Sequence, residues 1–394
     1  MANNNKHTGP NVPALRFPEI SGKWEKFRVS DFIEFFPTNS LSWDQLEYRG
    51  AGLLNLHYGM IHNGLPVQVD ASKNALPSIK EDFNPKKYTL CKEGDIAFAD
   101  ASEDTNDVGK AIEFNNCAGK SIVCGLHTIH GRDRLGLTSI GFKGYLFSSK
   151  AYHDQIKSIA QGTKVFSIKA SNFDEVILGL PKIEEQKKIS SLLMAIDDRI
   201  LTQSKIIEEL KTLRSALRYK LLDEMMVERT AKLGELCRIT TGKLDANAMV
   251  EGGGYPFFTC AEQVYEIDRY AFDTEALLVS GNGANLGHIH YYCGKFNAYQ
   301  RTYVLSDFSE DIQYLRQYLE AYLSKRIESE KNTGNTPYIV LGTLADMEIK
   351  LPKVPEQQRI AHDLSVLSQK IENETHMFKL FIQEKKTLLG KMFI

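Results

Sequence analysis

The chain has 394 residues, an ordinary apolar content and a formal net charge of −2. At roughly 100 to 200 residues per domain, this length predicts more than one domain. No run of about 18 uncharged apolar residues occurs and the first residues lack the apolar stretch of a signal peptide, so we expect a soluble, cytoplasmic protein. The nearly neutral charge excludes a globally basic surface, so any affinity for a polyanion must come from local patches or from partner subunits.

Residues 1–179 are predicted to form a first globular domain of mixed α/β type, preceded by an N-terminal segment. A short apolar run at residues 95–99, bounded by polar residues, indicates a strand. A helical pattern near residues 152–160 precedes a second predicted strand, which leads into Leu180.

Residues 180–228 are predicted to form a long helix. After a Leu-Pro pair, apolar residues follow a strict heptad spacing from Ile189 to Leu221, interrupted only by Gln203 and Arg214. Such spacing is typical of a coiled coil.

Residues 229–350 are predicted to form a second mixed α/β domain. The run at residues 276–280 indicates a strand, and residues 312–329 carry a helical pattern. The two domains are alike in plan but not in sequence.

Residues 351–394 repeat the first long helix. The segment from Leu351 matches the segment from Leu180 without a gap, with Leu-Pro-Lys, an apolar residue, Glu-Gln and Ile in register. The chain therefore contains an internal, pseudo-twofold repeat of a strand and a helix.

The polar interruptions of the two helices set their expected pairing. Glu374 and Lys385 occupy the positions that Gln203 and Arg214 occupy in the first copy. An antiparallel pair that places Arg214 opposite Glu374 also places Gln203 opposite Lys385, and every other layer is then apolar. A parallel pair would bring two cations together in the seam, where unpaired charge is costly. We therefore predict two long antiparallel coiled-coil helices in this register.

The length of the helices suggests a spacer. One such helix would be typical of a helical hairpin or a dimerisation coiled coil, but a hairpin needs a short loop and here a whole domain intervenes. Each helix of about 40 residues spans roughly 60 Å at 1.5 Å per residue. Along B-DNA that is on the order of 17 base pairs, enough for two domains to read half-sites about one helical turn apart.

Polar side chains of the two domains are candidates for contact with bases or phosphates. Arg suits guanine edges, Asn suits adenine edges and Lys suits phosphates, although each is also compatible with a solvated loop side chain. The candidates of the first domain are Asn106, Lys110, Lys120, His127, His130, Arg132, Arg134 and Lys143. Those of the second domain are Lys243, Asn282, Asn285, His288, His290, Arg301, Asn332 and Asn335.

Two patterns of the second domain are typical of enzymes. The Gly-rich stretch at residues 280–287 could bind phosphate, and residues 335–338 are similar to the Asn-Pro-Pro-Tyr of adenine-N6 DNA methyltransferases. The glycine spacing is G-x-G-x-x-x-G instead of G-x-G-x-x-G and no helical pattern follows, so a methyltransferase is only an alternative. The chain also lacks a G-x-x-x-x-G-K-[ST] loop for ATP.

The sequence predicts no metal site. His288 and His290 with Cys293 offer no convincing further ligand. The six cysteines include no C-x-x-C pair, which argues against a zinc ribbon or a disulfide framework, and we expect them to be reduced and mostly buried. They are Cys91, Cys117, Cys124, Cys237, Cys260 and Cys293.

Three segments resemble the specificity subunits of type I restriction-modification systems. They are the opening, with residues 13–20 and Gly-Lys-Trp-Glu at 22–25, the doubled Leu-Pro-x-x-x-Glu-Gln-x-x-Ile signature, and residues 277–287. The resemblance covers essentially the full chain. It implies two target recognition domains that each read one half of a split DNA sequence, with the helices as a ruler for the unspecified gap. The first domain departs from it at residues 100–109, where it lacks the Gly-rich turn of the second.

The resemblance also implies partners and cofactors. Two methylation subunits would methylate adenine with S-adenosylmethionine, and restriction subunits would translocate and cut double-stranded DNA with ATP and Mg²⁺. The chain itself would be a non-catalytic subunit that binds none of these cofactors. A coiled-coil assembly scaffold that binds only protein remains an alternative, favoured by the missing positive charge.

Overall fold

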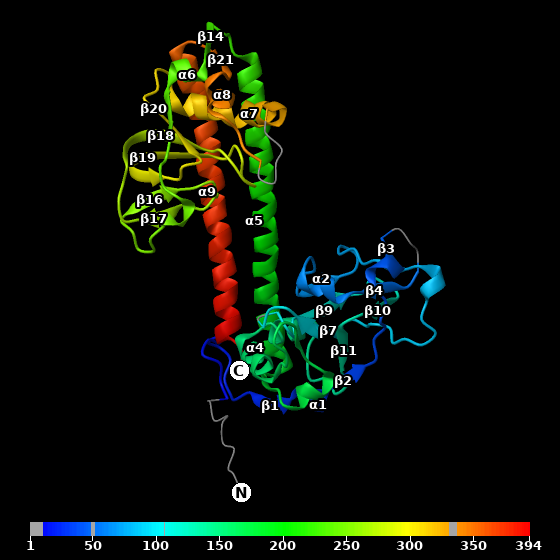
Figure 1. The fold of residues 1–394 in the computed structure, drawn as a ribbon. Helices are drawn as coiled ribbons and strands as arrows, with labels where there is room; N and C mark the ends of the chain where they lie inside the picture. Colours follow the sequence, from blue (N-terminus) through cyan, green and yellow to red (C-terminus); the bar gives the residue numbers. More distant parts are fainter. Residues whose placement is uncertain (1–10, 49–51, 106, 331–336) are drawn as a thin grey trace. The chain divides into compact units, whose positions relative to one another are not determined.

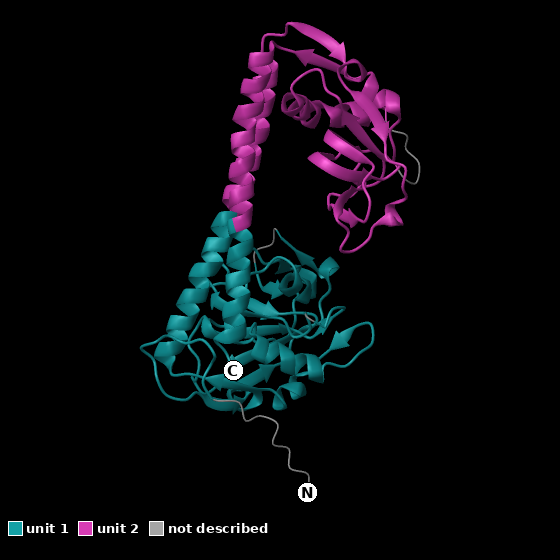
Figure 2. Ribbon diagram, turned by 90° about the vertical axis from the view of Figure 1, so that its left-hand side faces the viewer, with its two compact units in different colours: residues 1–203, 377–394 teal, residues 204–376 magenta. Residues whose placement is uncertain are grey.

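The structure, a computed structural model, describes residues 11–48, 52–105, 107–330 and 337–394. It is of mixed α/β type, as predicted (Figure 1). The chain divides into two compact units (Figure 2): unit 1 is Met1–Gln203 with Met377–Ile394, and unit 2 is Ser204–His376. Each unit takes a part of both long helices, so the units divide the chain at other points than the predicted domains do.

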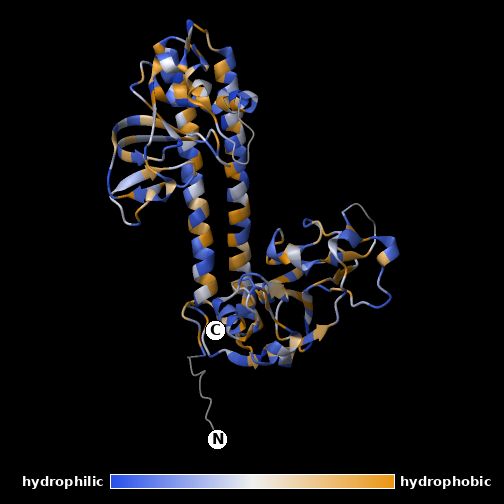
Figure 3. Ribbon diagram, in the orientation of Figure 1, coloured by the Kyte–Doolittle hydropathy of each residue, from blue (hydrophilic) through white to orange (hydrophobic). Residues whose placement is uncertain are grey.

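Two long helices confirm the prediction from the heptad spacing. They are α5 (Ile183–Glu224) and α9 (Val354–Lys391), and each follows a Leu-Pro pair. Apolar bands alternate with polar bands along both helices (Figure 3), as expected when one face packs against a partner helix and the other meets solvent.

The start of one helix and the end of the other share the core of each unit. In unit 1, Ile189 near the start of α5 belongs to the same buried cluster as Met392, just past the end of α9. In unit 2, Ile360 near the start of α9 belongs to the same cluster as Leu222, near the end of α5. Within each unit the two helices therefore run antiparallel, which confirms the predicted orientation.

The predicted register of the helix pair is wrong in unit 1. Lys385 Nζ lies 2.5 Å from Asp197 Oδ1, whereas the prediction placed Lys385 opposite Gln203. Asp197, the observed partner of Lys385, lies about one heptad closer to the start of α5 than Gln203 does.

Unit 2 shows the same displacement. Arg214 Nη1 donates to Ser368 Oγ at 3.2 Å, whereas the predicted partner, Glu374, pairs with Lys370 on its own helix. A shift of seven residues leaves a heptad pattern almost unchanged, so the pattern alone cannot fix the register. The burial of the helix ends in the two cores decides it.

Unit 1 contains two main sheets, with strand orders β10-β4-β6-β3 and β2-β11-β7-β9-β5, and the pairs β1-β13 and β12-β8. The predicted strand at residues 95–99 is β7, the predicted helix is α4, and the strand before Leu180 is β13. The strands are β1 (Glu25–Arg28), β2 (Ile33–Phe36), β3 (Leu46–Glu47), β4 (Leu54–Leu56), β5 (Gln68–Asp70), β6 (Ser78–Ile79), β7 (Ile96–Ala99), β8 (Ala101–Ser102), β9 (Ala111–Asn116), β10 (Ile122–Cys124), β11 (Thr128–Asp133), β12 (Phe166–Ser167) and β13 (Ile177–Leu180). The helices are α1 (Val29–Phe32), α2 (Tyr58–His62), α3 (Phe142–Leu146) and α4 (Lys150–Ile159), with short 3-10 turns η1 (Trp43–Gln45), η2 (Glu81–Phe83) and η3 (Ala170–Asp174).

Unit 2 contains a six-stranded sheet of order β15-β20-β18-β19-β16-β17 and the pair β14-β21. The predicted strand at residues 276–280 lies in β18, and the predicted helix is α7. The strands are β14 (Arg229–Lys232), β15 (Arg238–Thr241), β16 (Tyr255–Phe258), β17 (Tyr265–Ile267), β18 (Phe272–Ser280), β19 (Ile289–Ala298), β20 (Thr302–Ser306) and β21 (Glu348–Leu351). The shorter helices are α6 (Leu233–Leu236), α7 (Ile312–Glu330) and α8 (Leu341–Ala345), with the 3-10 turn η4 (Ala246–Ala248).

The repeat extends beyond the helix signature. In both units the strand before the Leu-Pro pair is antiparallel to the first strand of the unit, as β1 with β13 and β14 with β21. In both units that first strand leads directly into a one-turn helix and a further strand. Along the described part of the chain, no helix combines the length and the apolar character needed to cross a membrane.

Candidate nucleic-acid interface

Loops that are far apart in the sequence meet in unit 2. The carbonyl oxygen of Arg301 accepts hydrogen bonds from Gly281 N at 2.8 Å and Cys260 Sγ at 3.4 Å. Asn285 Nδ2 donates to the carbonyl oxygen of Cys260 at 3.2 Å. Two predicted candidates, Asn285 and Arg301, therefore belong to one group of loops.

Lys243 lies in a loop of the same group. Gln300 N donates to the carbonyl oxygen of Leu244 at 2.9 Å, next to Lys243 in the chain. Lys243 and Arg301 are both exposed, so their charges can reach a ligand. We call this group the unit 2 loop cluster, which comprises residues 242–245, 259–262, 281–288 and 299–301.

The Gly-rich stretch is a hairpin loop of this cluster and not a nucleotide-binding turn. It joins β18 to β19, which are antiparallel neighbours, and no helix follows it. Its backbone amides are used within the protein, since Gly287 N donates to Ser280 O at 2.8 Å and Gly283 N donates to Pro337 O at 3.0 Å. Gly283 has φ +83° and Gly287 has φ +84°, which glycine adopts readily. This geometry removes the main argument for a methyltransferase.

Three cations line a pocket of about 680 Å³ beside the loop cluster. They are Arg238, Lys243 and Arg269, and all three are exposed. Two carboxylates, Asp273 and Asp307, line the same pocket, so cations outnumber anions there. Only Lys243 was predicted, because Arg238 and Arg269 lie apart in the sequence and fall in no motif. Their shared position is visible only in the fold.

The histidines of the unit 2 loop cluster and β19 pack against each other, with ring centroids of His288 and His290 4.5 Å apart. His290 Nε2 lies 3.0 Å from the carbonyl oxygen of Ala261. Burial lowers the pKa of His290, and the nearby His288 and Arg316 lower it further, against the opposing hydrogen bond to Ala261. His290 is therefore mainly neutral near pH 7.

Asn282 also lies in the unit 2 loop cluster, where its backbone forms a bridge with Tyr338. Asn282 and His288 are partly exposed and remain candidates. Asn106, Asn332 and Asn335 lie outside the described residues.

Lys143 is wrongly predicted as a DNA contact. Its side chain is 2% exposed, and Nζ lies 3.2 Å from Glu113 Oε1 and donates to Thr138 Oγ1 at 3.0 Å. A buried cation already paired with a carboxylate cannot reach a phosphate. Lys143 instead neutralises Glu113 inside unit 1.

The side chain of Arg132 also makes its contacts within unit 1. Its Nη2 lies 2.6 Å from Asp95 Oδ2 and donates to the carbonyl oxygen of Leu90 at 2.9 Å, and the guanidinium lies over the ring of Phe36. The same carboxylate binds His130, whose side chain is 1% exposed. The structure gives both predicted residues a structural role within unit 1.

The other described candidates of unit 1 also make contacts within the protein. Lys110 and Lys120 donate to the carbonyl oxygens of His62 and Ala71, at 2.9 and 2.6 Å. Their assignment as DNA contacts stays a prediction, as it does for the exposed Arg134, which donates to the carbonyl oxygens of Ser30 and Asp31, and for His127, which pairs with Asp100.

Sequence reasoning missed four individually exposed aromatic side chains in unit 1. Such rings can stack on bases or pack against sugars. They are Trp43, Tyr48, Phe83 and Tyr88. Lys86 and Lys87, both exposed, lie beside Tyr88 in the chain. Isolated aromatic residues in a sequence usually enter a core, so only their exposure reveals them.

Comparison with known proteins gives the class and then the family. The fold matches a crystal structure of a type I restriction-modification system S subunit from M. genitalium, with a TM-score of 0.61 at 17% identity, over 97% of this chain and 99% of that one. It also matches a structure from work on complex assembly and conformational transition of the type I restriction-modification system, with a TM-score of 0.57 at 16% identity, over 93% of this chain and 96% of that one. The class is thus that of S-subunit folds.

Residues 139–212 and 227–377 match the type I restriction modification DNA specificity domain, and the chain belongs to this family. It is also 45% identical over 146 residues to the type I restriction enzyme EcoDI specificity subunit of Escherichia coli. That alignment covers 37% of this chain and 32% of the relative, so the chain matches about a third of the relative's length.

Proposed function

We propose that this chain is the DNA-specificity subunit of a type I restriction-modification complex. Each unit would read one half of a split site in double-stranded DNA, and the two long helices would set the gap. The chain itself carries out no chemistry. Two methylation subunits and the restriction subunits bring S-adenosylmethionine, ATP and Mg²⁺. Membership of the family and the duplicated architecture support this proposal.

The observation that carries the DNA proposal is the cationic pocket beside the unit 2 loop cluster. Arg238, Lys243 and Arg269 supply positive charge that neutralises backbone phosphates. Asn285 and Arg301, in the adjacent loops, are the side-chain types that read adenine and guanine edges. The pocket positions the duplex, and the loops supply the sequence preference.

The net charge of −2 is compatible with a small cationic pocket that binds phosphates and loops that contact bases. A few local cations bind phosphates on each unit, and the methylation subunits contribute the rest of the electrostatic affinity. Sequence preference depends on a small number of base contacts and not on total charge.

Binding of duplex DNA by the chain assembled with its methylation partner tests the proposal. Replacing Arg238, Lys243 and Arg269 by Ala should weaken binding to all sequences alike and reduce the slope of log affinity against log salt by about one per cation that contacts a phosphate. Arg301→Ala should instead cost about 1–3 kcal/mol on the preferred sequence and little on others.

Lys379→Ala, at an exposed position of α9, is the matched control and should leave both quantities unchanged. If the triple variant binds with unchanged affinity and unchanged salt slope, the pocket is not a phosphate site.

A further inference from the structure

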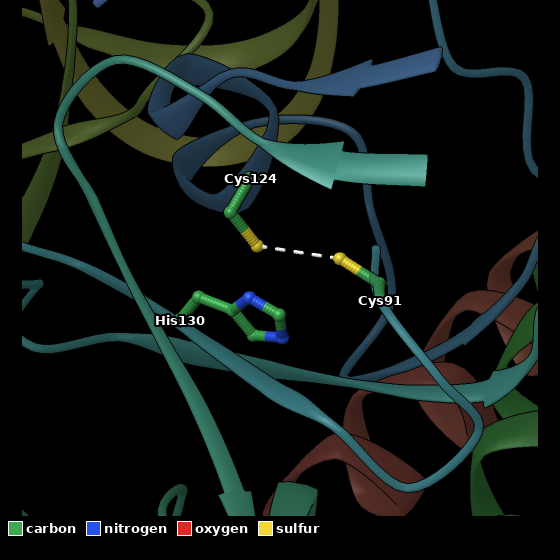
Figure 4. Close-up of side chains that lie close together, drawn as sticks. All are labelled: Cys91, Cys124 and His130. Carbon is green, nitrogen blue, oxygen red and sulfur yellow. Dashed lines mark hydrogen bonds between the residues drawn. The ribbon is translucent and has the colours of Figure 1, made fainter. Parts of the chain in front are cut away.

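Two cysteines and a histidine of unit 1, distant in the sequence, converge in its interior (Figure 4). Cys91 precedes β7, Cys124 ends β10 and His130 lies on β11. Their potential ligand atoms all lie within 4.8 Å of one another, and all three residues are buried. The function proposed above does not involve them.

The spacing of the two sulfurs matches that of a metal-bound pair. Cys91 Sγ and Cys124 Sγ are 3.6 Å apart. Two zinc–sulfur bonds of about 2.3 Å at the tetrahedral angle place their sulfurs about 3.8 Å apart. The fold therefore holds the two thiols close to the separation that tetrahedral coordination requires.

His130 is oriented as a metal ligand would be. Its Nε2 lies 2.7 Å from Asp95 Oδ2, so the carboxylate occupies this ring nitrogen and Nδ1 is the nitrogen left to bind a metal. Nδ1 is buried and has no hydrogen-bond partner, and Figure 4 shows the ring directed toward the two sulfurs. A buried polar nitrogen without a partner is unfavourable, and a bound metal ion would satisfy it. Metal-bound histidines commonly have a carboxylate on the other ring nitrogen in the same way.

Charge favours a divalent ion at this position. Two thiolates and a neutral imidazole carry a charge of about −2, which one divalent cation cancels, and a neutral complex is the form that a protein interior tolerates. The neighbouring Asp95 is already paired with Arg132. Because thiolate sulfur and imidazole nitrogen are the preferred donors of Zn²⁺, this ion fits the set better than Mg²⁺ or Ca²⁺.

A small pocket lies beside one of the three candidate ligands, Cys124. It has a volume of about 180 Å³ and is lined by Cys124 together with Tyr88 and Thr89 of the segment that precedes Cys91. Three protein ligands leave the fourth position of a tetrahedral zinc ion to a water molecule.

We propose that Cys91, Cys124 and His130 form a zinc site that ties the two main sheets of unit 1 together. β10 belongs to the four-stranded sheet and β11 to the five-stranded sheet. One ion would therefore link both sheets to the segment that carries Cys91, just before β7. The cysteine spacing in the sequence gave no sign of such a site, because its ligands come from three separate segments.

The test uses the untagged full-length chain, purified under reducing conditions and exposed to ZnCl₂ before desalting. Elemental analysis should find about one zinc per chain, and X-ray absorption should show sulfur at about 2.3 Å and nitrogen at about 2.0 Å. Co²⁺ in place of zinc should give the near-ultraviolet charge-transfer bands of cobalt bound to thiolate. These three measurements need no variant.

Cys91→Ser combined with Cys124→Ser should reduce bound zinc to less than about a tenth, whereas Cys237→Ser, at a buried free cysteine of unit 2, should leave it unchanged. Tryptophan fluorescence reports whether unit 1 of the variant is folded, because Trp24 and Trp43 both lie there. A reduced, folded wild-type chain that takes up no metal would overturn the proposal. Metal retained by the folded double variant would overturn it as well.

Discussion

Unit 1 contains a buried carboxylate, Glu113, whose stability in the interior depends on a few individual partners. Glu113 is fully buried, and besides Lys143 it accepts hydrogen bonds from Gly141 N at 3.0 Å and Gly144 N at 2.8 Å. The carboxylate therefore holds β9 and the start of α3 together. Such a group is tolerated in an interior only while its partners remain in place.

Lys143→Met should destabilise unit 1 by about 3 kcal/mol, because it leaves Glu113 as an uncompensated buried charge. Urea unfolding followed by tryptophan fluorescence measures this, since both tryptophans belong to unit 1. The control is Lys73→Met, at a side chain that is 81% exposed, which should change little. Equal effects of the two substitutions would show that Lys143 does not support the fold.

His290 gives unit 2 a pH-dependent contribution to stability. Burial lowers its folded-state pKa below the value of about 6.5 in the unfolded chain, so protonation favours unfolding. The contribution is present above pH of about 6.5 and is lost as the pH falls toward the folded-state pKa. His290→Gln should therefore lose less stability than the wild type between about pH 7.5 and 5.5. Hydrogen exchange of β19 peptides measures the difference, and identical pH profiles would contradict it.

For single residues, the sequence indicated which loops would carry polar side chains better than it indicated which side chains would pair with each other. Asn285 and Arg301 do lie together with Lys243, because loops that follow strands are the usual carriers of ligand contacts. Lys143 and Arg132 were mistaken for surface residues, since a lysine or arginine is usually exposed. Their carboxylate partners are Glu113 in β9 and Asp95 just before β7, and only folding brings them into contact.

Among the elements, the junction between each Leu-Pro pair and its helix explains the repeated signature. Gln186 Nε2 donates to the carbonyl oxygen of Pro181 at 2.9 Å, and Gln357 Nε2 donates to that of Pro352 at 3.0 Å. Both glutamines are buried. The repeated Gln therefore closes the first turn of each helix onto its own unit, which accounts for its presence in both copies.

Gln186→Ala should cost unit 1 about 1–3 kcal/mol, because it leaves the amide of Ser139, which donates to Gln186 Oε1, without its partner. Tryptophan fluorescence during urea unfolding measures the loss. Lys187→Ala, at the exposed next position of α5 in the same unit, should have little effect. A loss no larger than that of the control would remove this explanation of the signature.

The register of the long helices can be tested by exchanging charges. Asp197→Lys and Lys385→Asp should each destabilise unit 1, and the double variant should recover about 0.5–1 kcal/mol of the summed loss. Recovery is partial because Tyr145 also donates to Asp197. The double variant Arg214→Glu with Glu374→Arg should recover none of the summed loss of stability in unit 2. Recovery there would instead support the register expected from the heptads.

The two helices show where sequence reasoning succeeds and where it stops. Their existence and their antiparallel direction follow from the heptad spacing and from the charges in the seam. Their register does not, since a shift of one heptad still layers apolar residues on apolar residues. Contacts such as those of Ile189 and Met392 in the core of unit 1 decide between the alternatives, and those contacts require the tertiary fold.

For the whole molecule, the duplication is more regular in the long helices and their adjoining strand pairs than in the main sheets. Both units close with an equivalent antiparallel strand pair and an equivalent glutamine. Their main sheets differ in strand number and order. Under the function proposed above, the repeated helices would bind two identical methylation subunits, and the different sheets and loops would read two different half-sites. The sequence predicted this plan because the repeat is local, whereas the sheet orders depend on contacts between distant segments.

Adenine methylation of genomic DNA, mapped by single-molecule sequencing, tests the central claim most directly. A host that expresses this chain with its methylation partner is compared with a host that expresses the partner alone. We predict a new methylated motif, split into two half-sites by a fixed gap, only when the chain is present. If the complex assembles and no new motif is methylated, the chain does not specify DNA sequence and is an assembly scaffold.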